Sequence, residues 1–319
     1  EDWFHLVGTR ILDERDRWDT LESVVVPQTE WILETLAEHQ VRATFFVLGW
    51  IADKYPALVR QITEQGHEVG SHSYWHRAVH TMSPEAFRED LRRSIDAVGT
   101  AAGDGVKLRG FRAPGFSITP GCEWAFDAIL DAGLTYDASL FPSAHAHGGY
   151  PCPPGIHNLT TPAGQTLREL PMSSMSLCGK RVAFSGGGYL RVLPWRVIRR
   201  GMAQCERAQQ PAVVYLHPWD FAADSPVPAM TRAAKVVGEQ LGGSVAPFRL
   251  DRHRRAHHHA DFPGQTAEAA LAIGHLASQH PPLDFVRRRA IERPLPNQGF
   301  EQADAEVGFQ LANPSAHCG

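Results

Sequence analysis

Two histidines four positions apart, His72 and His76, are the residues of this sequence best suited to chemistry. They directly follow a short apolar stretch, residues 67–71. On one helical turn this spacing places two imidazoles on the same face, where both can bind one Zn²⁺-like ion at about 2.0–2.1 Å. The sequence holds 17 histidines, so such a pair also arises by chance. The metal interpretation therefore depends on the groups that accompany the pair.

Three further ionisable residues stand where predicted strands end. Arg112, Asp137 and His217 each close a short apolar segment. In a parallel barrel the carboxyl ends of the strands meet at one rim, so these side chains would converge on the histidine pair. Each also has an ordinary interpretation: Arg112 as a surface cation, Asp137 as a turn residue and His217 as a strand terminator. Their joint placement favours a site over chance.

Strands and helices alternate along most of the sequence. The apolar pattern predicts helices over residues 31–40, 55–65, 84–98 and 121–132, and strands over residues 41–49, 67–71, 110–112, 134–137 and 211–217. Ser83 is a predicted N-cap, with Pro84 at the first helical position. Repeated βα units of this length predict an α/β fold, a parallel barrel with its helices outside.

Composition excludes several classes of protein. With 31 Lys and Arg against 35 Asp and Glu the net charge is −4, so no basic field favours nucleic acid or anionic lipid. No apolar run approaches 18 residues, so no membrane span is predicted. The five cysteines are odd in number and form no Cys-x-x-Cys pair, which disfavours a disulfide framework and a zinc knuckle. A reducing, cytoplasmic location in a bacterium is the expectation.

Several segments together resemble the motifs of polysaccharide deacetylases that share the NodB homology domain. The histidine pair resembles their His-Ser/Thr-x-x-His motif, and Arg112 lies in a segment similar to Arg-x-Pro-x. Tyr215-Leu216-His217 is similar to their closing Leu-x-His motif. The matching segments keep the family's chain order, at residues 43–47, 72–76, 111–115, 136–140 and 215–217. The subgroup associated with bacterial exopolysaccharide clusters of the exosortase type is similar at residues 1–5, 186–191 and 217–221.

The resemblance implies both a fold and an activity. The fold would be a distorted (β/α) barrel of the NodB type over residues 1–235. The activity would be metal-dependent hydrolysis of N-acetyl groups on N-acetylhexosamine residues of a bacterial polysaccharide or oligosaccharide. Residues 236–319 are polar, with a histidine cluster at 257–259, and are predicted to be an irregular or disordered extension rather than a metal site. The oligomeric state stays open.

The resemblance also assigns roles to residues. His72 and His76, together with one carboxylate, would bind a divalent metal, with Zn²⁺ expected, and His217 would be the general acid that protonates the departing amine. Arg112 would orient a base carboxylate. Asp137 would position His217 or raise its pKa.

The first motif of the family falls at the start of the sequence. Relatives carry two carboxylates there, one acting as general base and one as metal ligand. The base is expected to be an Asp just upstream of Glu1, two positions before it. The ligand is then Glu1 or Asp2: alternation along a strand favours Glu1, and the turn geometry of other relatives favours Asp2.

Two other functions fit the same residues. One is a hydrolase of a small non-peptide C–N substrate on the same barrel. The other is a catalytically inactive carbohydrate-binding module, which metal content would distinguish. Aromatic residues such as Trp75, Trp124 and Trp219 at the rim would favour stacking on a sugar, whereas extra Arg or Lys facing the metal would favour a small acidic substrate.

Overall fold

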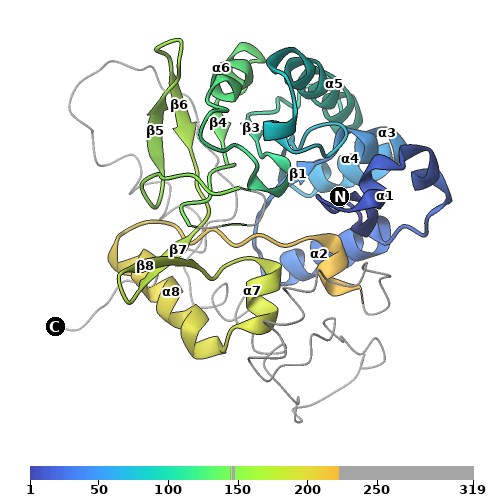
Figure 1. Cartoon of the computed structure of the whole chain (residues 1–319). Helices are drawn as coiled ribbons and strands as arrows, with labels where there is room; N and C mark the ends of the chain where they lie inside the picture. The colour runs from blue at the N-terminus through green and yellow to red at the C-terminus, as the bar shows by residue number, and fades with distance from the viewer. Residues whose placement is uncertain (144, 146–147, 223–319) are drawn as a thin grey trace, which may run out of the picture.

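The structure is a computed structural model that describes residues 1–143, 145 and 148–222 (Figure 1). Its main sheet has the strand order β1-β2-β3-β4-β6-β5. Neighbouring strands from β1 through β4 to β6 are parallel, and β5 pairs with β6 antiparallel. The predicted mixed α/β fold with a parallel sheet is therefore confirmed. The predicted extension over residues 236–319 lies outside the described residues.

The strands are short, and their register aligns their ends. Val47 pairs with Ser71, Phe111 pairs with Asp137, and Asp137 also pairs with Glu169. The side chains that follow these positions therefore gather at one edge of the sheet. The strands are β1 Thr44–Val47, β2 Glu68–Ser71, β3 Gly110–Phe111, β4 Tyr136–Asp137, β5 His157–Thr160 and β6 Thr166–Glu169, with a separate hairpin of β7 Ser174–Leu177 and β8 Lys180–Ala183.

Helices cover the sheet and also enclose the site. The α-helices are α1 Arg10–Asp13, α2 Val25–Glu38, α3 Gly49–Lys54, α4 Pro56–Glu64, α5 Pro84–Ala102, α6 Trp124–Asp131, α7 Gly187–Val192 and α8 Trp195–Arg207. The 3₁₀ segments are η1 Trp3–His5, η2 Arg15–Thr20, η3 Val79–Thr81, η4 Pro114–Phe116 and η5 Pro218–Phe221. Figure 1 shows α3, α4, α5 and α6 grouped together, and α5 packs on the other three.

Helix α5 begins as its sequence predicts. The Ser83 hydroxyl accepts a hydrogen bond from the Ala86 N–H at 3.2 Å, and Pro84 occupies the first helical position. The helix ends at Gly103, whose φ of +100° lies in the left-handed region that glycine adopts without strain. None of the helices in the described part of the chain is long and apolar enough to cross a bilayer.

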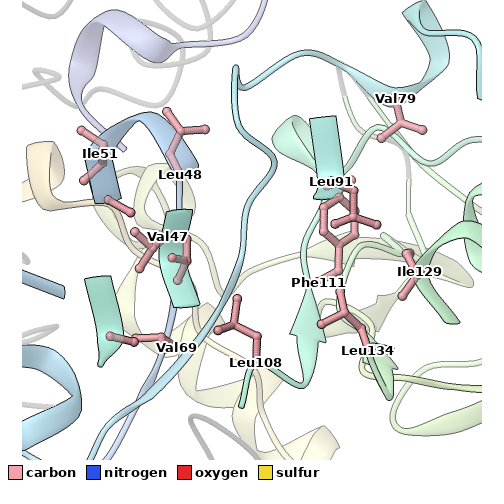
Figure 2. Packing of buried hydrophobic residues seen from close by; sticks show 14 of the residues in the cluster. Val47, Leu48, Ile51, Val69, Val79, Leu91, Leu108, Phe111, Ile129 and Leu134 are labelled. Atoms are coloured by element: carbon pink, nitrogen blue, oxygen red, sulfur yellow. The ribbon is translucent and has the colours of Figure 1, made fainter. Parts of the chain in front are cut away.

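The main core lies between the strands and these helices (Figure 2). Val47, Val69 and Phe111 of the strands share one buried cluster with Leu91 of α5 and Ile129 of α6. This alternation of strand and helix residues is what a βα layer requires, because each element buries its apolar face against the other.

The predicted strand over residues 211–217 departs most from expectation. Within it, Ala212 and Tyr215 form only isolated β-bridges, that of Tyr215 being a parallel one with Gly186. Among the described residues no ladder joins this segment to β1. The sheet therefore does not close into a barrel here. A cavity of 310 Å³ is lined by β1 and by residues 214–217, among other segments. Five of the residues predicted to form the site line this cavity, and Asp2 and Asp137 do not; the five are Glu1, His72, His76, Arg112 and His217.

Candidate active site

The structure brings Glu1, His72 and His76 together in one buried cluster. One ligand atom from each residue lies within 4.8 Å of the others. His72 Nε2 lies 3.2 Å from His76 Nε2 and 3.5 Å from Glu1 Oε2. The same Glu1 oxygen also contacts His76 Nε2. All three side chains are at most 10% exposed, so water does not screen the cluster.

This donor set fits a zinc-like ion. Two nitrogens bound at about 2.0–2.1 Å to a tetrahedral ion are about 3.3 Å apart, close to the separation of the two imidazole nitrogens. His72 Nδ1 lies 2.6 Å from the Arg112 carbonyl oxygen, which can only accept a hydrogen bond. Nδ1 therefore carries the proton, and the Nε2 lone pair faces the cluster. Two imidazoles and one carboxylate are a ligand set that catalytic zinc sites use.

The protonation states of the cluster also suit metal binding. Burial lowers the pKa of His72 to about 4, although Glu1 acts against this change, so the imidazole is neutral at neutral pH. Burial alone would raise the pKa of Glu1, but His76 and His217 more than offset it and hold that pKa well below its usual value. A neutral imidazole and an ionised carboxylate are the forms that bind a metal.

The loop that carries the two histidines is not helical, so the expected helical turn is wrong. Ser73 and His76 have φ values of +64° and +56°, which non-glycine residues adopt at a cost. Hydrogen bonds hold this conformation. The Asp90 carboxylate accepts from the Tyr74 and Trp75 N–H groups at 2.7 and 3.2 Å, and the Ser73 hydroxyl accepts from the His76 N–H at 3.0 Å.

Asp2, the alternative ligand, does not fit the structure. Its side chain is fully buried and already has several donors. It accepts from the Trp3 N–H at 2.9 Å, the Ser23 hydroxyl at 2.5 Å and the Val24 N–H at 3.2 Å. Asp2 therefore caps η1 and fixes the chain that leads into α2. Of the two acidic residues, Glu1 supplies the carboxylate of the cluster.

His217 lies beside the cluster without belonging to it. Its Nε2 is 3.1 Å from Glu1 Oε1, and its Nδ1 is 3.3 Å from Asp220 Oδ2, so both ring nitrogens face a carboxylate. Burial would lower the pKa of His217, but the charges of Glu1 and Asp220 outweigh it and the net shift is upward. The ring also stacks on Trp219, with centroids 4.6 Å apart. A protonated imidazole is thus favoured next to the candidate metal ligands.

Asp220 takes the position expected of Asp137. Asp220 Oδ2 also accepts from the His217 N–H at 2.8 Å, completing a capping box at η5. Asp137 instead accepts from the Ser139 hydroxyl at 2.5 Å and is the register partner of Glu169. The expectation that Asp137 positions His217 is therefore corrected. The His-x-x-Asp spacing could have indicated Asp220, whereas the pairing with Glu169 had no sequence signal.

Arg112 contributes through both its side chain and its backbone. The guanidinium donates from Nε to the Ala138 carbonyl at 3.0 Å and lies 4.5 Å over the Phe46 ring. Burial lowers its pKa to about 10, so it remains a cation at neutral pH. It lines the cavity together with Glu1 and His217. Orientation of a base carboxylate by Arg112 stays a prediction.

The three tryptophans named as candidates for sugar stacking lie in different surroundings. Trp219 lines the cavity. Trp124 packs against Phe87 with ring centroids 5.6 Å apart, at the edge of the main core. Trp75 is covered by the guanidinium of Arg15 at 4.6 Å. Of these three, only Trp219 is placed to contact a molecule in the cavity.

Two family models match consecutive parts of the chain. The model for polysaccharide deacetylases matches residues 17–129, which include His72, His76 and Arg112. A model described as a domain of unknown function, DUF3473, matches residues 138–252, which include His217.

Comparison with known proteins gives relatives of the same kind. The chain is 36% identical over 185 residues to a chitooligosaccharide deacetylase from Rhizobium leguminosarum bv. trifolii, a match that covers 50% of the chain and 83% of the relative. It is 35% identical over 80 residues to a peptidoglycan-N-acetylglucosamine deacetylase from Bacillus cereus, covering 25% of the chain and 29% of that protein. A family 4 carbohydrate esterase from Streptomyces lividans, solved with acetate, has 18% identity and a TM-score of 0.39, covering 67% of the chain and 83% of the esterase.

Proposed function

Since the chain belongs to the polysaccharide deacetylase family of hydrolases, we propose that it removes N-acetyl groups from N-acetylhexosamine residues of a bacterial glycan, using a bound divalent metal ion. The observation that carries the proposal is the cluster of Glu1, His72 and His76, with His217 3.1 Å from the same carboxylate. Metal ligands and a protonated imidazole then lie side by side at one cavity.

Glu1, His72 and His76 would hold the ion, with Zn²⁺ expected from two imidazoles and one carboxylate. When bound, such an ion polarises the acetyl carbonyl and lowers the pKa of a water molecule. The hydrogen bond from His72 Nδ1 to the Arg112 carbonyl keeps the Nε2 lone pair directed at the ion site.

The chain's own residues supply proton transfer. Hydrolysis breaks the amide C–N bond, so the departing nitrogen must gain a proton while water adds to the acetyl carbon. His217 would donate that proton from Nε2, and Asp220 holds the ring from the other nitrogen. The base that accepts the proton of water remains predicted as an Asp just upstream of Glu1.

The names of the relatives support a substrate class. One acts on chitooligosaccharide and another on the N-acetylglucosamine of peptidoglycan. We therefore propose N-acetylglucosamine as the residue that this chain deacetylates. Membership in the exopolysaccharide-cluster subgroup stays a prediction of the sequence.

Acetate release from a chitooligosaccharide tests the proposal. The chain would be assayed with an Asp and one further residue added before Glu1, so that the Asp lies two positions from Glu1, and with Asn in place of that Asp as the matched control. We expect release by the Asp form only, loss on chelation and recovery with Zn²⁺. His72→Ala should lose metal and activity together. His217→Gln should keep the metal and lose about 10²–10⁴-fold in rate, the usual contribution of a positioned general acid. His39→Ala, outside the cluster, should change neither.

Two outcomes would contradict the proposal. A zinc-loaded Asp form that releases acetate from no N-acetylated glycan would favour a small C–N substrate. A chain that binds no divalent ion would favour the inactive carbohydrate-binding module.

A further inference from the structure

A continuous path of hydrogen bonds runs from the candidate metal ligand His72 into the interior of the sheet. His72 Nδ1 donates to the Arg112 carbonyl at 2.6 Å. The N–H of the same peptide group, that of Ala113, donates to the Ser139 hydroxyl at 2.8 Å. Ser139 in turn donates to Asp137 Oδ1 at 2.5 Å. Every step has one donor and one acceptor, so the direction of each hydrogen bond is fixed.

The path ends in a buried pair of acids. Asp137 on β4 and Glu169 on β6 are register partners, and both are fully buried. Glu169 Oε1 accepts from the Leu140 N–H at 3.0 Å. The remaining oxygens, Asp137 Oδ2 and Glu169 Oε2, have no hydrogen-bond donor in the structure. A proton held between the two acids satisfies both oxygens.

Burial raises the pKa of Asp137 to about 6. Burial and the neighbouring charge of Asp137 raise the pKa of Glu169 well above its usual value. At neutral pH the pair therefore shares one proton and carries one negative charge. Ser139 donates to Asp137, which places that charge at the end of the path.

We propose that Asp137, Glu169 and Ser139 are positioning residues that strengthen metal binding by His72, acting through the Arg112–Ala113 peptide group. This inference rests on the proposed metal site. The charge on Asp137 makes the Ser139 oxygen a better acceptor for the Ala113 N–H. That hydrogen bond polarises the peptide, so its carbonyl oxygen accepts more strongly from His72 Nδ1. The imidazole is then held in one tautomer and its Nε2 becomes more basic.

The chain offers a matched control for Ser139. The Ser117 hydroxyl is also fully buried and accepts from a backbone N–H, that of Val79, at 2.8 Å. Replacing either serine by alanine leaves one buried backbone N–H without its acceptor, so both substitutions should destabilise the protein similarly. Only Ser139 lies on the path to His72.

Metal affinity measured by competition with a chromophoric zinc chelator is the first readout. We expect Ser139→Ala to weaken Zn²⁺ binding by about 10–100-fold, and Ser117→Ala to stay within about twofold of the parent chain. Asp137→Asn, which keeps an acceptor for Ser139 but removes the charge, should weaken binding in the same direction. Glu169→Gln, which still donates to Asp137 and leaves the charge, should stay near the parent value. Equal affinities for Ser139→Ala and Ser117→Ala would overturn the inference.

The tautomer of His72 in the metal-free protein is the second readout, measured by long-range ¹H–¹⁵N NMR and assigned with His72→Ala. The parent chain should show the proton on Nδ1, and Ser139→Ala should show a mixture. An unchanged tautomer in Ser139→Ala would overturn the inference. Since this readout needs no metal, failure of the parent chain to bind Zn²⁺ would refute the proposed function while the path is still tested.

Discussion

Asp90, on the buried side of α5, holds the loop that carries both candidate histidine ligands. Its side chain is 7% exposed, and its two carboxylate oxygens accept from the Tyr74 and Trp75 N–H groups. Asp90→Ala removes both acceptors at once. The Tyr74 N–H is then buried without a partner, at about 1–3 kcal/mol, and the Trp75 N–H is partly buried and costs less. We expect a loss of about 2–4 kcal/mol in the free energy of unfolding.

Asp90→Ala should also weaken metal binding. Ser73 and His76 hold left-handed backbone conformations that relax when nothing fixes the loop. His76 Nε2 would then leave the short contact with Glu1, and zinc affinity should fall by about tenfold or more. Urea unfolding monitored by circular dichroism gives the stability, and a chelator competition on the folded variant gives the affinity.

Asp96→Ala on the same helix is the control. Its carboxylate is 63% exposed and pairs with Arg92, so its loss should cost at most about 1 kcal/mol and leave zinc binding unchanged. Equal stability losses in the two variants, or an Asp90→Ala protein with the parent zinc affinity, would refute the reasoning.

Two further predictions concern stability. Burial raises the pKa of both Asp137 and Glu169, so the folded state binds more protons than the unfolded state at mildly acidic pH. The contribution of this pair to the free energy of unfolding therefore falls as pH rises from about 4 to 7. Glu169→Gln should therefore gain stability relative to the parent chain over that range in urea titrations at several pH values, and a pH-independent difference would count against a shared proton. Gly110→Ala should be destabilising by more than about 2 kcal/mol, because its Cβ would lie 2.1 Å from Tyr136 Cζ. Gly99→Ala in α5 has space for the added methyl group and should stabilise the protein by about 0.5–1 kcal/mol. Thermal melts of the two glycine variants check this order, and a reversed order would show that the contact at β3 is not tight.

Local signals in the sequence predicted much of the fold. The Ser83 cap with Pro84 marked the start of α5, and apolar segments marked β1 and β2. These features depend on neighbours in the chain, so spacing and residue type are enough to find them. The short strands β5 to β8 were not predicted, because four-residue strands carry too little periodicity. Helices α7 and α8 were not predicted either. Residues 211–217 have the composition of a strand but form only isolated bridges at Ala212 and Tyr215, since pairing depends on a partner distant in sequence.

The site was predicted in its residue types and only partly in its contacts. The spacing of His72 and His76 was informative, although a loop held by Asp90 creates the geometry and no helix does. Glu1 and Asp2 could not be distinguished until the hydrogen bonds that Asp2 receives were known. Asp137 was predicted as the carboxylate that positions His217, a place that Asp220 takes. The contact of Asp137 with Glu169 crosses strands and leaves no local pattern in the sequence, whereas Asp220 lies three residues from His217.

Anomalous X-ray diffraction from zinc-soaked crystals tests the central claim most directly. The account predicts one zinc peak with Glu1 Oε2, His72 Nε2 and His76 Nε2 at about 2.0–2.2 Å, and with His217 outside the coordination shell. A zinc ion bound by His217 and Asp220 instead, or no ion near His72, would contradict it.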